Sequence, residues 1–268
     1  MKISIATAVY NREKTIADAI NSVARQKHDD FEVEHIVVDG GSTDGTCKIL
    51  SDFEAKVKGE ERDGYSFRWI SEKDNGVYDA MNKGLKMATG DVVAILNSDD
   101  FYHRDDTLAK VAAEFAADPE LQVVYGDNVW VNDGALDKVI RYSNGNNWNW
   151  FTARCGVMPP HATFFCRREC FEQYGYYDPS YKICADFERE LMFLVKLKLK
   201  SKYLPSAFMT MRKGGVSTAG LGSHWTSIKE CYRACRQVGV FTCWPMQFIK
   251  LLVKLPQIFI NKIPKDRI

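Results

Sequence analysis

The chain has 268 residues, of which 46% are hydrophobic and 26% are charged, so it is long enough to bury a sizeable core. This composition excludes a collagen, a low-complexity disordered chain and a small disulfide scaffold. The net charge of +1 gives no indication of nucleic acid binding, but residues 191–268 carry 14 basic and only 2 acidic side chains. That asymmetry predicts a basic surface near the C-terminus that faces an anionic partner.

The first hundred residues alternate between strand and helix patterns. We expect strands at Ile3–Tyr10, Glu34–Asp39, Ser66–Ser71 and Asp91–Leu96, and helices at Thr15–Gln26, from Ser42 or Thr43 to Phe53, and at Val77–Met87. The charged stretch Glu54–Tyr65 is expected to be turn-like. This alternation predicts an α/β fold with a mostly parallel sheet and helices on both faces. Ligands of such sheets bind at the carboxyl ends of the strands.

The pattern is less regular after the first hundred residues. We expect a helix at Asp105–Asp118, short strands at Gln122–Tyr125, Val129–Asn132 and Lys138–Tyr142, a strand at His161–Arg167, a helix at Ala185–Leu199 and a strand at Lys202–Met211. From His224 onward the chain reads as helical, with breaks near its prolines.

Four polar clusters follow the four strands expected in the first hundred residues. They are Thr7–Asn11, Asp39–Gly45, Asp74–Gly76 and Asn97–Asp100. Each cluster alone has a structural explanation, because Asp or Asn followed by Gly forms turns, and Ser or Thr caps helices. Four clusters at one edge of a parallel sheet together predict a ligand site at that edge.

The cluster Asn97–Asp100 points most directly to chemistry. Adjacent carboxylates after an apolar strand repel each other unless a cation or a helix N-terminus relieves the repulsion. Oxygen ligands suit Mg²⁺ or Mn²⁺, and substrate phosphates and water commonly complete the coordination of these ions. The cluster therefore predicts a divalent cation with a phosphate-bearing ligand, and the alternative is that Asp99 and Asp100 only solvate a loop.

Several ordered motifs resemble those of family 2 glycosyltransferases of the GT-A fold. They are Ser4–Asn11, VVDGGSTDGT at Val37–Thr46, DNGVYDAMNKG at Asp74–Gly84 and ATGDVVAILNSDD at Ala88–Asp100. Two further segments, His161–Glu188 and the GGVS of Gly214–Ser217, resemble the bacterial polysaccharide and O-antigen (lipopolysaccharide) branch of that family. The resemblance covers about residues 1–220 and implies a GT-A domain with a nucleotide-sugar half at about 1–100 and an acceptor half at about 101–220. Residues 221–268 are expected to form a basic, amphipathic helical extension.

The resemblance also implies roles for individual residues in an inverting, Mn²⁺- or Mg²⁺-dependent transfer from a nucleotide-diphosphate sugar. Thr7, Ala8 and Tyr10 would line the nucleoside, Asp39 would hold the base or ribose, and Asp99 would be the metal ligand of the family's Asp-x-Asp motif, with Asn97 and Ser98 beside it. Two positions depart from the family pattern. Gly40 stands where members often have a second acid, and Asn97 replaces the first Asp of Asp-x-Asp.

Inverting transfer needs a carboxylate that removes a proton from the attacking acceptor hydroxyl. Asp186 lies where the resemblance implies this general base, and Glu188 is the fallback. From the residues alone, the alternative explanation of Asp186 and Glu188 is that acids are common in the first turn of a helix.

Four further residues are weaker candidates. Lys73 and Asn82 are expected near a donor phosphate or ribose, although surface solvation is equally consistent with their positions. His161 is a candidate contact to the acceptor or the diphosphate. Trp148 could stack on an acceptor sugar ring, and core packing is the alternative role for it.

The expected function is transfer of a sugar, with UDP-sugar as the expected donor, to a polyprenyl-diphosphate-linked or other glycan acceptor in bacterial surface polysaccharide synthesis. Two alternatives use other chemistry: a sugar nucleotidyltransferase, and a non-catalytic carbohydrate-binding protein. No secretory signal or membrane span is recognised, so we expect a cytoplasmic protein. Phe241–Ile263 alternates apolar residues with lysines, which favours docking on the anionic inner face of the cytoplasmic membrane, and the alternative is packing in the fold or in a homo-oligomer.

Overall fold

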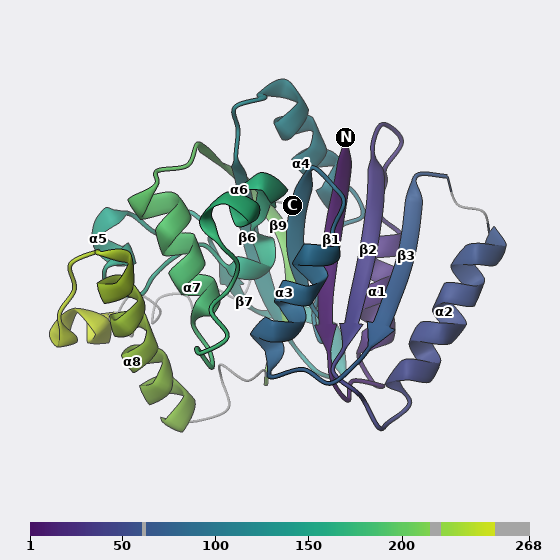
Figure 1. The fold of residues 1–268 in the computed structure, drawn as a ribbon, viewed down its shortest axis with the longest axis horizontal. Helices are drawn as coiled ribbons and strands as arrows, with labels where there is room; N and C mark the ends of the chain where they lie inside the picture. The colour runs from purple at the N-terminus through teal and green to yellow at the C-terminus, as the bar shows by residue number, and fades with distance from the viewer. Residues whose placement is uncertain (61–62, 215–220, 250–268) are drawn as a thin grey trace. The chain divides into compact units, whose positions relative to one another are not determined.

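The computed structural model describes residues 1–60, 63–214 and 221–249 (Figure 1). Most of the GGVS motif and the last part of the amphipathic stretch, residues 250–263, therefore lie outside the described residues. The described chain divides into two compact units. Unit 1 contains Met1–Gln122 and Phe165–Pro179, and unit 2 contains Val123–Phe164 and the residues from Ser180 onward.

Unit 1 is built on a sheet whose strand order is β3-β2-β1-β4-β8. The first four of these strands are parallel, and β8 pairs with β4 in the antiparallel direction. Strands β1 (Lys2–Val9), β2 (Glu32–Asp39), β3 (Tyr65–Ser71), β4 (Val92–Asn97), β5 (Phe101–Tyr102) and β8 (Phe165–Arg167) belong to this unit. The predicted parallel α/β sheet of the first hundred residues is confirmed.

The strand register brings the polar strand ends of unit 1 into one row. Val9 of β1 pairs with Asp39 of β2, and Asp39 pairs with Ser71 of β3. On the other side of β1, Ala8 pairs with Asn97 of β4. The carboxyl ends of four strands therefore meet at one edge, as the sequence predicts.

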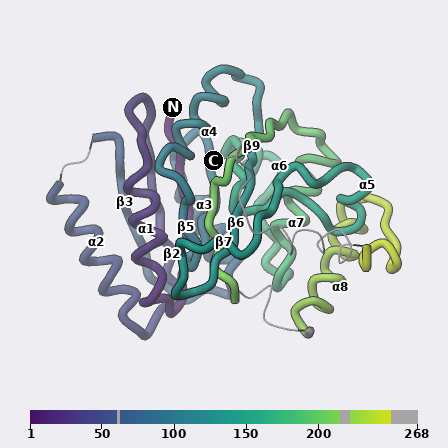
Figure 2. Tube along the Cα trace, turned by 180° about the vertical axis from the view of Figure 1, so that it is seen from behind, coloured from purple at the N-terminus to yellow at the C-terminus, as the bar shows by residue number. Residues whose placement is uncertain are grey.

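Helices cover both faces of the unit 1 sheet. Helix α3 lies in front of the strands in Figure 1 and α1 lies behind them, and Figure 2 shows the same arrangement from the other side. Gly84 permits the close approach of α3, because a Cβ atom there would lie 2.9 Å from the Cβ of Ala6 on β1. The helices of unit 1 are α1 (Ile16–Ala24), α2 (Thr46–Glu60), α3 (Val77–Met87), α4 (Thr107–Ala117) and α6 (Arg168–Tyr174).

Among the strands of unit 2, β6 pairs with both of the others. Strand β6 (Val123–Asn132) pairs with β7 (Ala135–Ser143) in the antiparallel direction and with β9 (Ser201–Arg212) in the parallel direction. The helical elements of unit 2 are α5 (Trp150–Ala153), the 3₁₀ turn η1 (His161–Thr163), α7 (Ala185–Glu190), the π-helical turn η2 (Leu191–Lys196) and α8 (Leu221–Val238). Residues 244–249 are also helical.

The structure corrects the predicted turn at Glu54–Tyr65, because α2 continues to Glu60. Its buried residues Leu50, Phe53 and Val57 recur at helical spacing, and this apolar face outweighs the high charge of the stretch. The charged side chains also form pairs four residues apart, such as Lys58 with Glu54, which support a helix.

Four other predicted elements differ in the structure. The two short strands at Gln122–Tyr125 and Val129–Asn132 are one continuous strand, β6. The strand expected from His161 begins only at Phe165, because the Thr163 hydroxyl donates to the carbonyls of Pro160 and Gly126 and holds a 3₁₀ turn. The helix expected to reach Leu199 turns into the π-helical η2 after Glu190.

Candidate functional site

Asp39 is the most tightly held side chain at the strand-end edge of unit 1. The residue is 0% exposed, and its carboxylate accepts hydrogen bonds from the backbone N–H of Gly41 (3.1 Å) and Ser42 (2.9 Å). The hydroxyls of Ser42 and Ser71 and the thiol of Cys47 also donate to it. Burial acts to raise the pKa of Asp39, but these hydrogen bonds outweigh it, so the pKa lies below its ordinary value.

The loops after β1 and β2 are joined by reciprocal hydrogen bonds. The backbone N–H of Asn11, a residue with a φ of 49°, donates to the Ser42 hydroxyl at 2.7 Å, and the Asn11 side-chain oxygen accepts from the N–H of Thr43 at 2.9 Å. In a similar way, the N–H of Glu13 donates to the Asp44 carboxylate at 3.1 Å, and the Glu13 carboxylate accepts from the N–H of Gly45 at 2.8 Å. The Thr7–Asn11 and Asp39–Gly45 clusters therefore form one ordered loop surface.

Gly40 leaves space for an acid from another strand end. A Cβ atom at Gly40 would lie 2.2 Å from the carboxylate oxygen Oδ2 of Asp74. Asp74, in the loop between β3 and α3, therefore places a carboxylate beside position 40, where the family pattern often has an acid. Lys73 is exposed on the same loop, with its side chain beside Gly41.

The three residues expected to line a nucleoside differ in exposure. The Thr7 side chain is 1% exposed and its hydroxyl lies 3.0 Å from Nε2 of His35 inside the sheet. Ala8 is also buried, whereas Tyr10 is 54% exposed at the edge. Among these three, only the Tyr10 side chain is available to a ligand in the described conformation.

In the Asn97–Asp100 cluster, the amide of Asn97 is hydrogen-bonded to the buried carboxylate of Asp100. Asn97 donates through Nδ2 to Oδ2 of Asp100 at 2.9 Å, and Asp100 is 2% exposed. Asp99 is half-buried. Ser98 is buried, and its carbonyl accepts from the Thr15 hydroxyl at 2.9 Å.

The residues of this cluster fit a divalent cation that takes most of its ligands from a substrate. Within residues 1–60, 63–214 and 221–249, no group of three or more His, Cys, Asp and Glu side chains is arranged to hold a metal ion. A hard cation bound through one or two carboxylates is completed by phosphates and water. The Asp99 carboxylate and the neutral Asn97 amide supply that limited set of oxygens.

Asn82 is engaged inside unit 1 rather than at the edge. Its Nδ2 donates to the carbonyl of Tyr177 at 2.7 Å, and its Oδ1 accepts from the N–H of Tyr177 at 3.0 Å. A contact between Asn82 and a bound donor would have to replace both hydrogen bonds.

In unit 2, Asp186 and His161 come together. Oδ2 of Asp186, in the first turn of α7, lies 3.1 Å from Nδ1 of His161, and both side chains remain about one-fifth exposed (22% and 21%). A partly exposed carboxylate oriented by a histidine is a suitable general base.

The other two acids of α7 are buried. Glu188 forms an ion pair with Arg189 at 2.9 Å. Burial raises the pKa of Glu190 well above its ordinary value, and the negative charge of Asp186 raises it further. Of the three acids on α7, Asp186 is therefore the one whose side chain is partly exposed.

Trp148, the other candidate in unit 2, lies against neighbouring aromatic rings. Its Nε1 donates to the Tyr125 hydroxyl at 3.1 Å, and the two ring centroids are 6.4 Å apart. Tyr125 also packs against Tyr203. These contacts are those of a packed aromatic cluster, and Trp148 is only half-buried in it.

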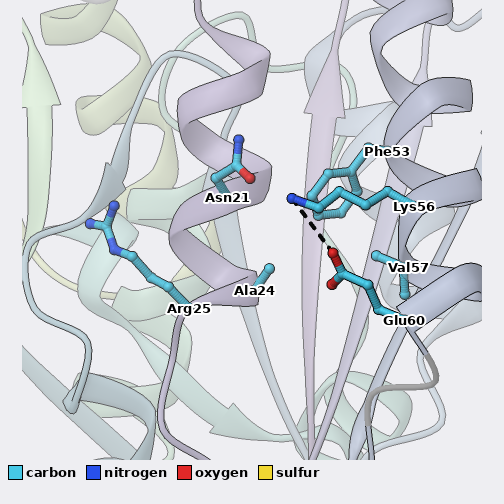
Figure 3. A pocket seen from close by; sticks show the side chains of 7 residues that line it. All are labelled: Asn21, Ala24, Arg25, Phe53, Lys56, Val57 and Glu60. Carbon is cyan, nitrogen blue, oxygen red and sulfur yellow. Dashed lines mark ion pairs between the residues drawn. The ribbon is translucent and has the colours of Figure 1, made fainter.

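A small pocket of about 160 Å³ lies away from these residues, between α1 and α2 (Figure 3). It is lined by Asn21, Ala24, Arg25, Phe53, Lys56, Val57 and Glu60. Lys56 and Glu60 pair across its rim at 3.8 Å. The lining comes from the later turns of helices that return antiparallel to the strands, so the pocket is remote from the strand-end edge.

Comparison with known proteins shows the family. The sequence model of Glycosyl transferase family 2 matches residues 4–175. Over 208 residues, the chain is 31% identical to a PGL/p-HBAD biosynthesis glycosyltransferase of Mycobacterium bovis, an alignment that covers 75% of this chain and 73% of the relative. It is also 28% identical to an uncharacterized glycosyltransferase of Nostoc, over 69% of this chain and 57% of the relative. The chain belongs to glycosyltransferase family 2.

Solved structures show the same fold at low sequence identity. S. aureus TarS 1–349 in complex with UDP-GlcNAc has a TM-score of 0.65 and 19% identity, covering 96% of this chain and 73% of that one. The mannosyltransferase PcManGT of Pyrobaculum calidifontis, in complex with GDP-Man and Mn²⁺, has a TM-score of 0.60 and 17% identity, covering 96% and 72%. The expected GT-A fold is confirmed.

Two residues of the edge were given no individual role from the sequence. Ser71 donates to Asp39 at 2.6 Å from the end of β3, and Asp74 fills the space beside Gly40. Both lie in or next to the polar segment that follows the third predicted strand. The signal was present, but pairing them with β2 requires the register between strands.

Proposed function

We propose that this glycosyltransferase moves a sugar from a UDP-sugar to a lipid-linked glycan acceptor with inversion at the anomeric carbon, in bacterial surface polysaccharide synthesis. The pairing of Asp186 with His161 carries the proposal, because it presents one accessible, oriented carboxylate in unit 2. The TarS complexes with UDP and with UDP-GlcNAc support a uridine nucleotide donor.

In the proposed reaction, Asp186 accepts the proton of the acceptor hydroxyl as its oxygen bonds to the anomeric carbon. The bond from that carbon to the diphosphate oxygen breaks, and the nucleoside diphosphate leaves with the electron pair. His161 keeps the Asp186 carboxylate oriented through their 3.1 Å contact. A single displacement of this kind needs no enzyme nucleophile, so one general base is sufficient.

The edge of unit 1 binds the donor in this proposal. Tyr10 contacts the nucleoside, the buried Asp39 shapes the loop around it, and Lys73 attracts the phosphates. Asp99, with Asn97, would hold Mn²⁺ or Mg²⁺, which neutralises the negative charge of the departing diphosphate. The Mn²⁺ complex of PcManGT supports a divalent cation.

We also propose that unit 2 docks on an anionic membrane through an aromatic surface. This surface consists of Trp150, Phe151, Phe241, Trp244 and Phe248, each 43–64% exposed. The guanidinium of Arg154 lies over the rings of Trp150 (4.4 Å) and Phe241 (4.9 Å). Aromatic side chains with adjacent cations are typical of the membrane–water interface. None of the helices formed by the described residues is long and apolar enough to cross a bilayer.

A donor screen tests the proposed transfer. Wild-type protein with Mn²⁺ should release nucleoside diphosphate from one sugar nucleotide far faster than from the others, and the new glycosidic bond should have the opposite anomeric configuration to the donor. Retention of configuration would contradict the inverting mechanism. Sugar binding without affinity for UDP would favour the non-catalytic carbohydrate-binding alternative. Release of pyrophosphate from a nucleoside triphosphate supplied with a sugar 1-phosphate would favour the nucleotidyltransferase alternative.

Flotation tests the proposed membrane contact. Full-length protein should float with anionic phosphatidylserine vesicles, less so at high salt, and a Phe241→Ser, Trp244→Ser double variant should float less. The matched control is Leu136→Ser, which removes an exposed apolar side chain of β7 in the same unit. If the double variant and the control float like the wild type, the aromatic surface does not bind membrane.

A further inference from the structure

The segment that leads into α7 is held by one side chain of α8. The carboxylate of Glu230 accepts hydrogen bonds from three consecutive backbone N–H groups, those of Lys182 (2.8 Å), Ile183 (2.9 Å) and Cys184 (3.0 Å). Cys184 is the residue that caps the N-terminus of α7, two positions before Asp186. Glu230, on a helix distant in sequence, therefore fixes the backbone just before Asp186.

Other residues on the same face of α8 hold the same segment. Cys184 contacts the Ser227 hydroxyl at 3.4 Å and the Cys231 thiol at 3.6 Å. One turn further on, Arg233 donates to the Ser180 hydroxyl at 2.6 Å. One side of α8 therefore contacts residues 180–184, through positions 227, 230, 231 and 233, which lie within two helical turns.

The charge of Glu230 is exceptional for its part of the sequence. Residues 191–268 contain only two acids, and this one lies where a row of backbone N–H groups converges. Consecutive N–H groups form an anion-binding concavity, and hydrogen bonds to a charged acceptor are stronger than those between neutral groups. An alanine or a basic residue at position 230 would leave these three donors without that acceptor.

We propose that Glu230 is a positioning residue for glycosyl transfer, which fixes the start of α7 so that Asp186 faces the acceptor hydroxyl. This inference rests on the proposed function, in which Asp186 is the general base. A base must be held in near-attack geometry, and a displacement of about 1 Å can cost about 10²-fold in rate. It also follows that α8, assigned from the sequence to an extension outside the main domain, supports the catalytic helix.

A double-variant cycle tests the proposal with full-length protein. The rate measured is the release of UDP from the donor chosen in the screen, with water as acceptor. Glu230→Ala should lower this rate by about 10- to 100-fold while the affinity for UDP with Mn²⁺ stays within about twofold, because the donor site of unit 1 is unchanged. In the Asp186→Asn background, Glu230→Ala should have less than about a twofold further effect, since it acts through Asp186.

The matched control is Arg236→Ala, which removes an exposed charge from the same helix and should leave the rate unchanged. If Glu230→Ala does not fold, Glu230→Gln, which keeps one acceptor oxygen, replaces it in the cycle with a smaller expected loss. An equal loss in both backgrounds would overturn the proposal, because it would show a purely structural role, and so would no loss at all. If Asp186→Asn itself has wild-type activity, the proposed base fails, which is a different and recognisable result.

Discussion

The strand-end edge of unit 1 and the first turn of α7 in unit 2 use acidic side chains in opposite ways. Asp39 is 0% exposed and accepts five hydrogen bonds from its own loop, α2 and β3. Asp186 keeps about one-fifth of its side chain exposed and contacts His161. The buried Asp39 carboxylate supports the loop that surrounds it, whereas the partly exposed Asp186 carboxylate is the one that we propose as proton acceptor.

The largest expected effect concerns Asp99, a half-buried acid of the edge. Asp99→Ala should lower metal-dependent transfer by about 10²- to 10³-fold, because the charge of the leaving diphosphate is no longer neutralised. The measurement is the rate of nucleoside diphosphate release with Mn²⁺ and with EDTA. Asp52→Ala, an exposed acid of α2 paired with Lys48, is the control. Near-normal turnover of Asp99→Ala that EDTA does not change would remove the metal role.

The second prediction is that Asp39 contributes mainly to the stability of the fold. Asp39→Ala leaves the half-buried N–H groups of Gly41 and Ser42 without this acceptor, so the free energy of unfolding should fall by about 2–4 kcal/mol. Urea denaturation measures this change. If stability is unaffected and only UDP affinity is lost, Asp39 is a ligand contact rather than the support of the loop, and the contrast with Asp186 disappears.

Acid should destabilise the sheet of unit 1 through a buried histidine. Burial lowers the pKa of His35 from 6.5 to about 3, so the unfolded chain binds a proton that the folded chain does not. The free energy of unfolding should therefore fall as the pH drops below 6.5, by up to about 2 kcal/mol at pH 5. His35→Gln should flatten this dependence. Parallel slopes for wild type and variant would show that His35 is not responsible.

The smallest expected effect concerns the departure from Asp-x-Asp. Asn97→Asp replaces the amide that donates to buried Asp100 with a second carboxylate. The lost hydrogen bond and the new repulsion should lower the free energy of unfolding by about 1–3 kcal/mol in the absence of metal, and Mn²⁺ should recover part of it. Thermal unfolding with and without Mn²⁺ measures both the loss of stability and its recovery by the metal. An unchanged midpoint without metal would show that the Asn97–Asp100 hydrogen bond is unimportant.

Local sequence patterns predicted most of unit 1. The strands have buried apolar runs and α3 has a strong apolar face, so both could be located from periodicity, and Val77–Met87 has the bounds that the sequence predicts. The extension of α2 to Glu60 was missed, because ion pairs and a sparse apolar face stabilise a stretch that is highly charged.

The arrangement around Asp186 could not be predicted from the sequence alone. Asp186 itself was found through the family motif, but its contact with His161 and the role of Glu230 depend on segments far apart in the chain. The same holds for Asp74 beside Gly40, which depends on how β2 and β3 pair. Residues that act through tertiary contacts leave no periodic signal.

The most direct test of the account compares turnover and donor affinity in Asp186→Asn. This substitution keeps the shape of the side chain and removes the proton acceptor, so transfer should fall by about 10²-fold or more, while the dissociation constant for UDP with Mn²⁺, measured by calorimetry, should stay within about twofold. Glu188→Gln, at the ion-paired acid of the same helix, should retain far more activity than Asp186→Asn. Near wild-type transfer by Asp186→Asn, together with an inactive Glu188→Gln, would contradict the account and assign the general base to Glu188.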